Sequence, residues 1–141
     1  MPEEWETFYV ETLRNNATNT PLSYSLDLSE AIKDGIQNNT RLQLNSDQDD
    51  AEVFITGNIN SYSITPVALQ EGDNASQNRL TVAVQFNILI SEPEEKEMVL
   101  NANRYLDYDS NTDLGVVENE LLAEINEQIV QDVINKLLAN W

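Results

Sequence analysis

A long alternation of apolar and polar residues at positions 78–90 constrains the fold of this chain more than any other feature. In an extended strand, alternate side chains point to opposite faces. The apolar members of the alternation share one face: Leu80, Val82, Val84, Phe86, Ile88 and Ile90. The other face carries small or uncharged side chains: Thr81, Ala83, Gln85 and Asn87. Because a parallel sheet covered on both sides is apolar throughout, this pattern predicts a largely antiparallel sheet with one covered face and one open polar face.

The remaining patterns predict an α+β domain with the element order β-α-β-β-β-α, in which two helices pack on one face of a mixed, mainly antiparallel four-stranded sheet. The predicted strands span residues 5–11, 53–64, 78–90 and 98–107, and the predicted helices span residues 22–38 and 116–140. A short further strand can begin at Leu42 and Leu44. A helical crossover joins the first two long strands, so they run parallel if they are neighbours. The length of 141 residues fits a single domain, 1–141.

Residues with known end preferences predict where these elements stop and start. Thr20 is an expected N-cap, and Pro21 then occupies the first position of the first helix. Gly115, with Glu118 three residues later, is the expected cap of the second helix. Pro66 is expected to end the second strand, because proline lacks the N–H group that a strand ladder uses.

Apolar stripes at helical spacing indicate which side of each helix is buried. The first helix has the stripe Leu22, Leu28, Ala31, Ile32, Gly35 and Ile36. Gly35 on this stripe predicts a close approach of the helix to the sheet, at a helix-propensity cost of about 1 kcal/mol. The second helix has a broad stripe of Val117, Leu121, Ile125, Ile129, Val133 and Leu137, joined by Leu122, Val130, Ile134 and Leu138. Within it, Leu121, Ile125, Ile129 and Val133 are expected to be buried against Val82, Val84 and Phe86.

Charge and composition exclude several classes of function. The net charge of −18 arises from 25 acidic and 7 basic residues. Nucleic-acid binding is therefore not expected, since it depends on lysine and arginine contacts with phosphates, and adhesion to an anionic membrane surface is disfavoured for the same reason. The chain contains neither histidine nor cysteine, which removes the usual thiol and imidazole chemistry. No apolar run reaches the roughly 20 residues that a membrane-spanning helix needs.

Clusters of carboxylates are the remaining candidates for catalysis or metal binding. Asp47, Asp49, Asp50 and Glu52 lie close together, but the stretch lacks the central glycine of an EF-hand loop and reads as a solvated acidic loop. No pair of carboxylates falls in a predicted cleft of the kind that a glycosidase uses. We therefore expect no enzymatic activity, no resident metal and no cofactor.

The few basic residues are the candidate contacts for an anionic ligand or a partner. Arg79, with Asn78, stands where the long loop 69–78 meets the third strand, and it forms either a surface ion pair or a contact with an anionic headgroup. For the ion pair, Glu71 and Asp73 of that loop are the nearest acids in sequence. Arg104 has the parity of the apolar face of the fourth strand, so it lies at a bulge or a strand end, or it contacts such a headgroup. A loop of this length suits a functional role.

Short motifs throughout the chain resemble the Bacteroidetes branch of LptE, the lipopolysaccharide-assembly lipoprotein of the outer membrane. The clearest are Ser-Tyr-Ser-Ile-Thr-Pro-Val-Ala at residues 61–68 and Asn-Arg-Leu-Thr-Val at residues 78–82. The resemblance extends to residues 19–22, 30–34, 105–110, 117–121 and 139–141, and thus covers most of the chain.

The resemblance implies two helices on a four-stranded sheet, as does the order of elements. It also implies a lipid anchor on the periplasmic side of the outer membrane and a role as a plug inside the large β-barrel LptD, which delivers lipopolysaccharide to the cell surface. Well-known members bind lipopolysaccharide through basic residues, which have no evident counterparts in this acidic chain. The plug role is therefore the firmer implication.

A polar sheet face is compatible with such a plug, because large outer-membrane barrels have a polar lumen. The residues expected on it, here called the polar sheet face, are Thr56, Asn58, Asn60, Thr81, Gln85, Asn87, Asn101 and Asn103. Simple exposure to solvent explains the same residues equally well. Two other functions remain open at this point: an envelope lipoprotein that binds a periplasmic partner such as a cell-wall synthase, and a module that binds a glycan or a lipid.

Overall fold

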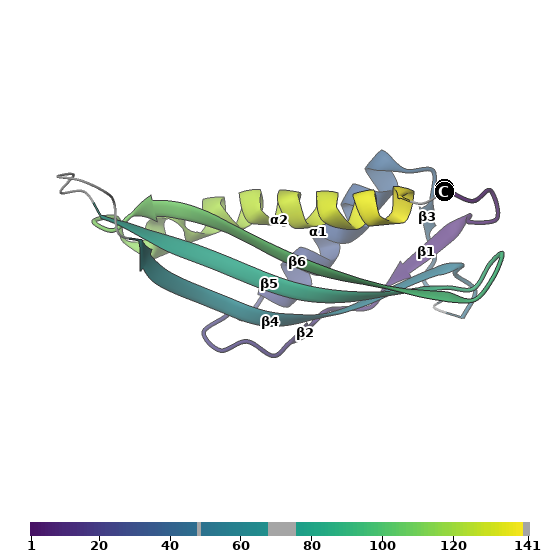
Figure 1. Cartoon of the computed structure of the whole chain (residues 1–141), viewed down its shortest axis with the longest axis horizontal. Helices are drawn as coiled ribbons and strands as arrows, with labels where there is room; N and C mark the ends of the chain where they lie inside the picture. The colour runs from purple at the N-terminus through teal and green to yellow at the C-terminus, as the bar shows by residue number, and fades with distance from the viewer. Residues whose placement is uncertain (48, 68–75, 140–141) are drawn as a thin grey trace.

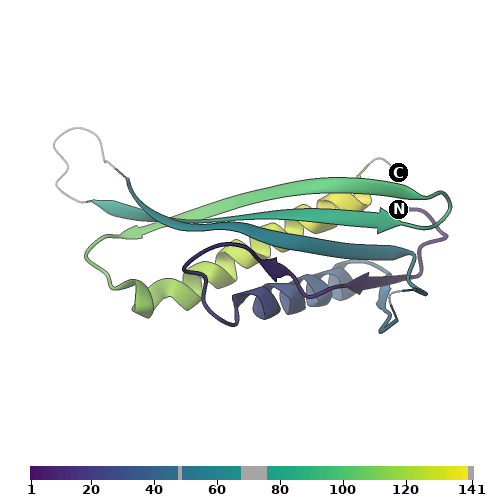
Figure 2. The ribbon, with the colours of Figure 1, turned by 90° about the horizontal axis from the view of Figure 1, so that it is seen from below.

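Three long strands form the centre of the fold: β4 (Val53–Val67), β5 (Gln77–Ile90) and β6 (Lys96–Asp109). They pair antiparallel as a meander, and the pairing of β5 with β6 is continuous from Gln77 opposite Asp109 to Ile90 opposite Lys96. The computed structural model describes residues 1–47, 49–67 and 76–139. In Figures 1 and 2, the two helices of this part of the chain, α1 (Tyr24–Asn39) and α2 (Leu114–Leu138), lie on the same side of the sheet.

Short strands complete the sheet at the side of β4. The strand β1 (Thr7–Val10) runs parallel to β4 with Phe8 opposite Val53, which confirms the expected parallel pair. Two more strands of two residues each, β2 (Arg14–Asn15) and β3 (Gln43–Leu44), pair with β4 and β1. The described sheet thus has six strands rather than the four expected. The short strand expected at Leu42 and Leu44 is confirmed as β3, whereas β2 was not predicted because two residues are too few to leave a periodic pattern in the sequence.

The apolar face of the sheet packs against the helices to form one core. All six apolar residues of the alternation in β5 are buried, as predicted, together with Phe8, Val53, Ile55 and Ile59 from the neighbouring strands. From α2, Ile125, Ile129, Val133 and Leu137 are buried, while Val117 and Leu121 near its start are only partly buried. The parity of the sequence therefore identified which face of the sheet the helices cover.

A bulge in β4 changes its parity halfway along. The register with β5 shifts between Ile59 and Ser61, so Ile59 and Tyr62 both point into the core although they are three residues apart. Asn60 lies at this bulge and has no partner in the register, unlike the regular position expected for it on the polar sheet face.

The prediction that Pro66 ends the second strand is wrong. The strand β4 continues to Val67, and Pro66 lies opposite Asn78 of β5. The pairing of β4 with β1 and β2 stops at Ile59, so beyond that point β4 is an edge strand in the described sheet. An edge strand tolerates proline because half of its N–H groups have no ladder partner to lose.

The first helix starts later than predicted. Its N-cap is Ser23, not Thr20, and Leu22 is fully exposed rather than part of the buried stripe. The reason is local: Thr20 Oγ1 donates back to the carbonyl of Ala17, and the N–H of Tyr24 donates to the carbonyl of Pro21. These bonds form a turn ahead of the helix and engage the hydroxyl group that would have capped it.

Gly35 permits the close approach of two helices rather than of a helix and the sheet. A β-carbon at residue 35 would lie 2.2 Å from Cγ1 of Val130 in α2. The apolar stripe identified the buried side of α1, but it could not show that α2 packs against part of that side.

The second helix is capped by Asp113, which the sequence prediction missed. The side chain of Asp113 accepts a hydrogen bond from the N–H of Gly115 at 3.1 Å. Gly115 is therefore inside the first turn and not the cap. Glu118 does not fold back as a capping-box residue either, because its carboxylate accepts a hydrogen bond from the hydroxyl of Tyr62.

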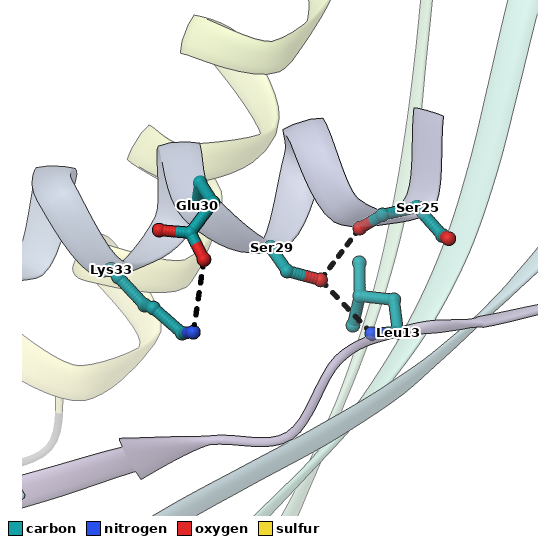
Figure 3. A network of polar contacts seen from close by, with 5 residues as sticks. All are labelled: Leu13, Ser25, Ser29, Glu30 and Lys33. Carbon is teal, nitrogen blue, oxygen red and sulfur yellow. Dashed lines mark hydrogen bonds and ion pairs between the residues drawn. The ribbon is translucent and has the colours of Figure 1, made fainter. Parts of the chain in front are cut away.

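One buried hydroxyl ties the segment between β1 and β2 to α1 (Figure 3). Ser29 is fully buried; its Oγ accepts a hydrogen bond from the N–H of Leu13 at 2.9 Å and donates one to the carbonyl of Ser25 at 2.6 Å. Leu13 has no ladder partner for this N–H group in the described sheet, so the serine replaces one. Nearby, Lys33 forms an ion pair with Glu30 at the helix surface.

Candidate interface on the open sheet face

The face of the sheet that the helices leave open carries a block of uncharged polar side chains. In the register, Asn58 of β4 lies opposite Gln85 of β5, which in turn lies opposite Asn101 of β6. These three amides form a row that Arg14 of β2 continues beyond Asn58. The rows on either side consist of Thr56, Asn87 and Val99, and of Ser61, Ala83 and Asn103. The rows offer neutral hydrogen-bond donors and acceptors on a protein of net charge −18.

Arg79 lies on this open face, at the end of the sheet where the long loop joins β4 to β5. Its Nε donates to Asp107 Oδ1 at 2.8 Å, and its second nitrogen donates to Asp107 Oδ2 at 3.2 Å. The guanidinium also lies 4.0 Å from the ring centroid of Tyr105. The hydrogen bonds and the charge of Asp107 raise the pKa of Arg79. The acid that pairs with Arg79 is therefore on the neighbouring strand; Glu71 and Asp73 lie outside the described residues, as does most of loop 69–78.

Arg104 lies on the opposite face of the sheet, toward α2. It is opposite Val82 in a continuous stretch of register, so the expectation of a bulge or a strand end is wrong. Its guanidinium donates two hydrogen bonds to the carboxylate of Asp132 in α2, one of them at 2.9 Å. These bonds raise the pKa of Arg104, and they connect β6 to α2.

The three candidate residues do not form one site. Asn78 pairs with Tyr108 and shares the parity of Leu80, so it points to the side of the helices, as Arg104 does. Arg79 points to the open side. A ligand on the open face can therefore reach Arg79 and the amide rows, but Arg104 and Asn78 belong to the other side.

Two buried tyrosines on the helix-covered side of the sheet were not singled out from the sequence. Tyr24 of α1 donates to Asn126 Oδ1 at 2.7 Å, and Tyr62 of β4 donates to Glu118 of α2. The two rings contact edge to face, with centroids 6.1 Å apart. Burial raises the pKa of both phenols, and the hydrogen bond to Glu118 raises that of Tyr62 further. The bulge at Asn60 hid Tyr62, since without the bulge Tyr62 has the parity of the open face.

One residue of the acidic loop before β4, Glu52, has a structural role. The carboxylate of Glu52 accepts hydrogen bonds from the N–H groups of Glu6 and Thr7, at 2.8 and 3.1 Å.

Over the described ranges, no three acidic side chains are arranged so that they could hold a metal ion. Neither of the helices in those ranges is long and apolar enough to cross a membrane.

Solved structures with this fold include several bacterial lipoproteins. A minor lipoprotein from Acinetobacter baumannii is 21% identical, with a TM-score of 0.53 over 96% of this chain and 94% of that chain. Lipoprotein B from Nitrosomonas europaea is 16% identical, with a TM-score of 0.58 over 94% and 82%. Rare lipoprotein B from Shewanella oneidensis is 18% identical, with a TM-score of 0.50 over 93% and 94%. At these identities the likeness establishes the fold: a small α+β domain with one helix-covered sheet face.

The family model of LptE, described as lipopolysaccharide-assembly, matches residues 5–137. The chain therefore belongs to the LptE family of lipopolysaccharide-assembly proteins, which confirms the resemblance found in its motifs. Among curated proteins, none gives a significant match to the sequence.

Proposed function

We propose that this chain is a non-catalytic envelope lipoprotein that plugs and helps to assemble an LptD-type β-barrel at the periplasmic side of the outer membrane. Family membership supports a role in lipopolysaccharide assembly. The three similar solved structures are lipoproteins, which supports a lipid anchor. The particular contribution of this chain would be a surface that fits the inside of a barrel.

The observation that carries the proposal is the neutral row of Asn58, Gln85 and Asn101 on a strongly acidic protein. A plug must exchange its own hydration for contacts with a polar wall, and a charged surface would lose more solvation free energy in that exchange than an amide surface does. Amides can also bond to the wall through trapped water without much loss of affinity. The amide rows lie on the side of the described sheet that the helices leave uncovered (Figures 1 and 2).

The test is to place a bulky side chain in the middle of this face. Gln85→Trp should lower the recovery of the barrel with the tagged lipoprotein from native outer membrane several-fold, and lipopolysaccharide at the cell surface should fall with it. Asn119→Trp, at an exposed position of α2, is the matched control for size and for expression. Equal recovery of the barrel with both variants would refute a barrel contact through the polar sheet face.

Arg79 tests the far end of the same face. Its partners Asp107 and Tyr105 are on β6, so Arg79→Ala removes a surface contact between strands and not a core group. If Arg79 contacts the barrel, the variant should have the melting temperature of the wild type but should form less of the complex with the barrel. A variant that melts earlier but assembles normally would assign Arg79 a structural role only.

The identity of the recovered partner decides between the proposed function and its alternative. A large β-barrel in the native complex supports the plug. A periplasmic cell-wall synthase in its place would contradict it and would support an activator lipoprotein.

A further inference from the structure

A groove with an apolar floor lies at the other end of the open face, where the hairpin between β5 and β6 turns. Its volume is about 820 Å3. The lining comes from four places: the end of β1, the loop that precedes β4, the start of β4, and the hairpin with the ends of β5 and β6 that it joins. We call it the hairpin groove; in Figure 1 the hairpin is the turn at the right end of β5 and β6.

The floor of the hairpin groove departs from the polar pattern of the rest of the face. Phe54 lies directly opposite Leu89 in the register, and Tyr9 stacks on Phe54 with ring centroids 5.5 Å apart and an angle of 20° between the planes. The side chain of Leu89 is 40% exposed, although the same parity elsewhere in β5 carries amides and threonine. Because these side chains point away from the core, the fold itself does not need them to be apolar.

The walls of the groove are acidic. Four carboxylates line it, those of Glu11, Asp49, Glu95 and Glu97, against one basic side chain, that of Lys96. Glu97 is opposite Leu89 in the register, so a carboxylate stands directly beside the apolar floor. The negative potential of a concave acidic site attracts a cation, and contact of the apolar floor with an apolar group is favourable because it removes apolar surface from water.

We propose that the hairpin groove binds an extended segment of a partner protein that carries an apolar or aromatic side chain flanked by lysines or arginines. The floor would accept the apolar side chain as an anchor, and the carboxylates would pair with the flanking bases. A simple cation would leave the apolar floor unused. A second copy of this chain would bring a further net charge of −18 to an acidic surface. The inference does not depend on the proposed barrel, since a basic segment of any envelope partner fits the same chemistry.

The test uses a short synthetic peptide, Lys-Trp-Lys-Leu-Lys with blocked ends, and a counterpart in which glutamate replaces each lysine. Titration of the 15N-labelled protein should shift the backbone signals of Phe54, Leu89 and Glu97 with the basic peptide alone. Leu89→Asn, which extends the amide pattern of this face and should therefore fold, should weaken binding by about tenfold, as expected for loss of one buried apolar contact.

Non-specific attraction to an acidic protein is the main competing explanation, and a charge-matched pair of variants separates it. Glu97→Lys at the groove and Glu127→Lys at an exposed position of α2 change the net charge equally. The proposal requires Glu97→Lys to weaken peptide binding several-fold more than Glu127→Lys does. Equal weakening, or shifts spread over the whole surface, would overturn it. Shifts of the groove signals on raising the protein concentration without peptide would also overturn it, in favour of self-association.

Discussion

Gly35 of α1 and Val130 of α2 are so close that the two helices could not pack as they do if residue 35 had a side chain. A β-carbon built there would lie 2.2 Å from Cγ1 of Val130, well inside van der Waals contact. Valine in a helix is restricted to one main rotamer, so it cannot easily turn away. This contact fixes the separation of the two helices on the sheet.

Gly35→Ala is expected to lower the free energy of unfolding by up to about 2 kcal/mol, measured by urea denaturation. Alanine favours the helix by about 1 kcal/mol, but overpacking against Val130 costs about 1–3 kcal/mol. In the double variant Gly35→Ala/Val130→Ala the clash is gone, so the loss should be smaller than the sum of the two single losses. Strict additivity would show that the helices adjust without strain.

Ser29→Ala is expected to lower the free energy of unfolding by about 1–3 kcal/mol, because the buried N–H of Leu13 loses its acceptor. The control is Ser23→Ala: the Ser23 hydroxyl is exposed, makes no cap hydrogen bond and donates only to Asp27 at the surface, so the change there should stay within about 0.5 kcal/mol. Similar losses in both variants would mean that water replaces the hydroxyl of Ser29.

The parts of the fold that could be predicted are those with a regular period. The alternation in β5 and β6 and the stripe of α2 repeat over many residues, so the covered face and the long helix followed from the sequence. The LptE family was identified from short sequence motifs. What could not be predicted depends on contacts between distant residues or on single irregular positions: the bulge at Asn60, the strand that continues through Pro66, and the short strand β2.

The candidate site shows the same division. The neutral face was visible as residues of one parity, but the partners of its charged neighbours were not, since Asp107 and Asp132 are each 28 positions from the arginine that they bind. The hairpin groove was missed because Phe54 and Leu89 were treated as members of ordinary strands. Their outward parity was the available signal, because both are large apolar side chains on a face that is mostly polar.

Tyr62 and Tyr24 should make the protein less stable at alkaline pH. The folded state raises the pKa of both phenols above the ordinary value of 10.0, so above that pH the unfolded chain loses these protons and the folded protein keeps them. Their contribution is therefore fully present below about pH 10 and is lost as the pH rises further, by at most about 1.4 kcal/mol per pH unit for each group. Urea melts from pH 8 to 11 should show a shallower decline in Tyr62→Phe and Tyr24→Phe than in the wild type. An identical decline in the double variant would contradict this assignment.

Direct affinity for lipopolysaccharide is expected to be weak without divalent cations. The net charge of −18 repels the phosphates of the lipid headgroup, and three of the seven basic residues, Lys33, Arg79 and Arg104, are already paired with carboxylates. Titration of the purified protein should give little binding in EDTA and stronger binding with magnesium, which can bridge the two acidic surfaces. Tight binding in EDTA at moderate salt would show that a local site outweighs the net charge.

The parallel pairing of β1 with β4 has a consequence for how the protein folds. The ladders of β4 with β5 and of β5 with β6 join neighbouring segments, whereas Phe8 must find Val53 across the whole of α1. Closing that longer loop costs more chain entropy, so β1 is expected to dock after the meander has formed. Mutations in β1 should then accelerate unfolding and leave the folding rate almost unchanged. The first strand of the chain would thus be the last to join the sheet, and in stopped-flow experiments it would determine how long the folded protein survives rather than how quickly it forms.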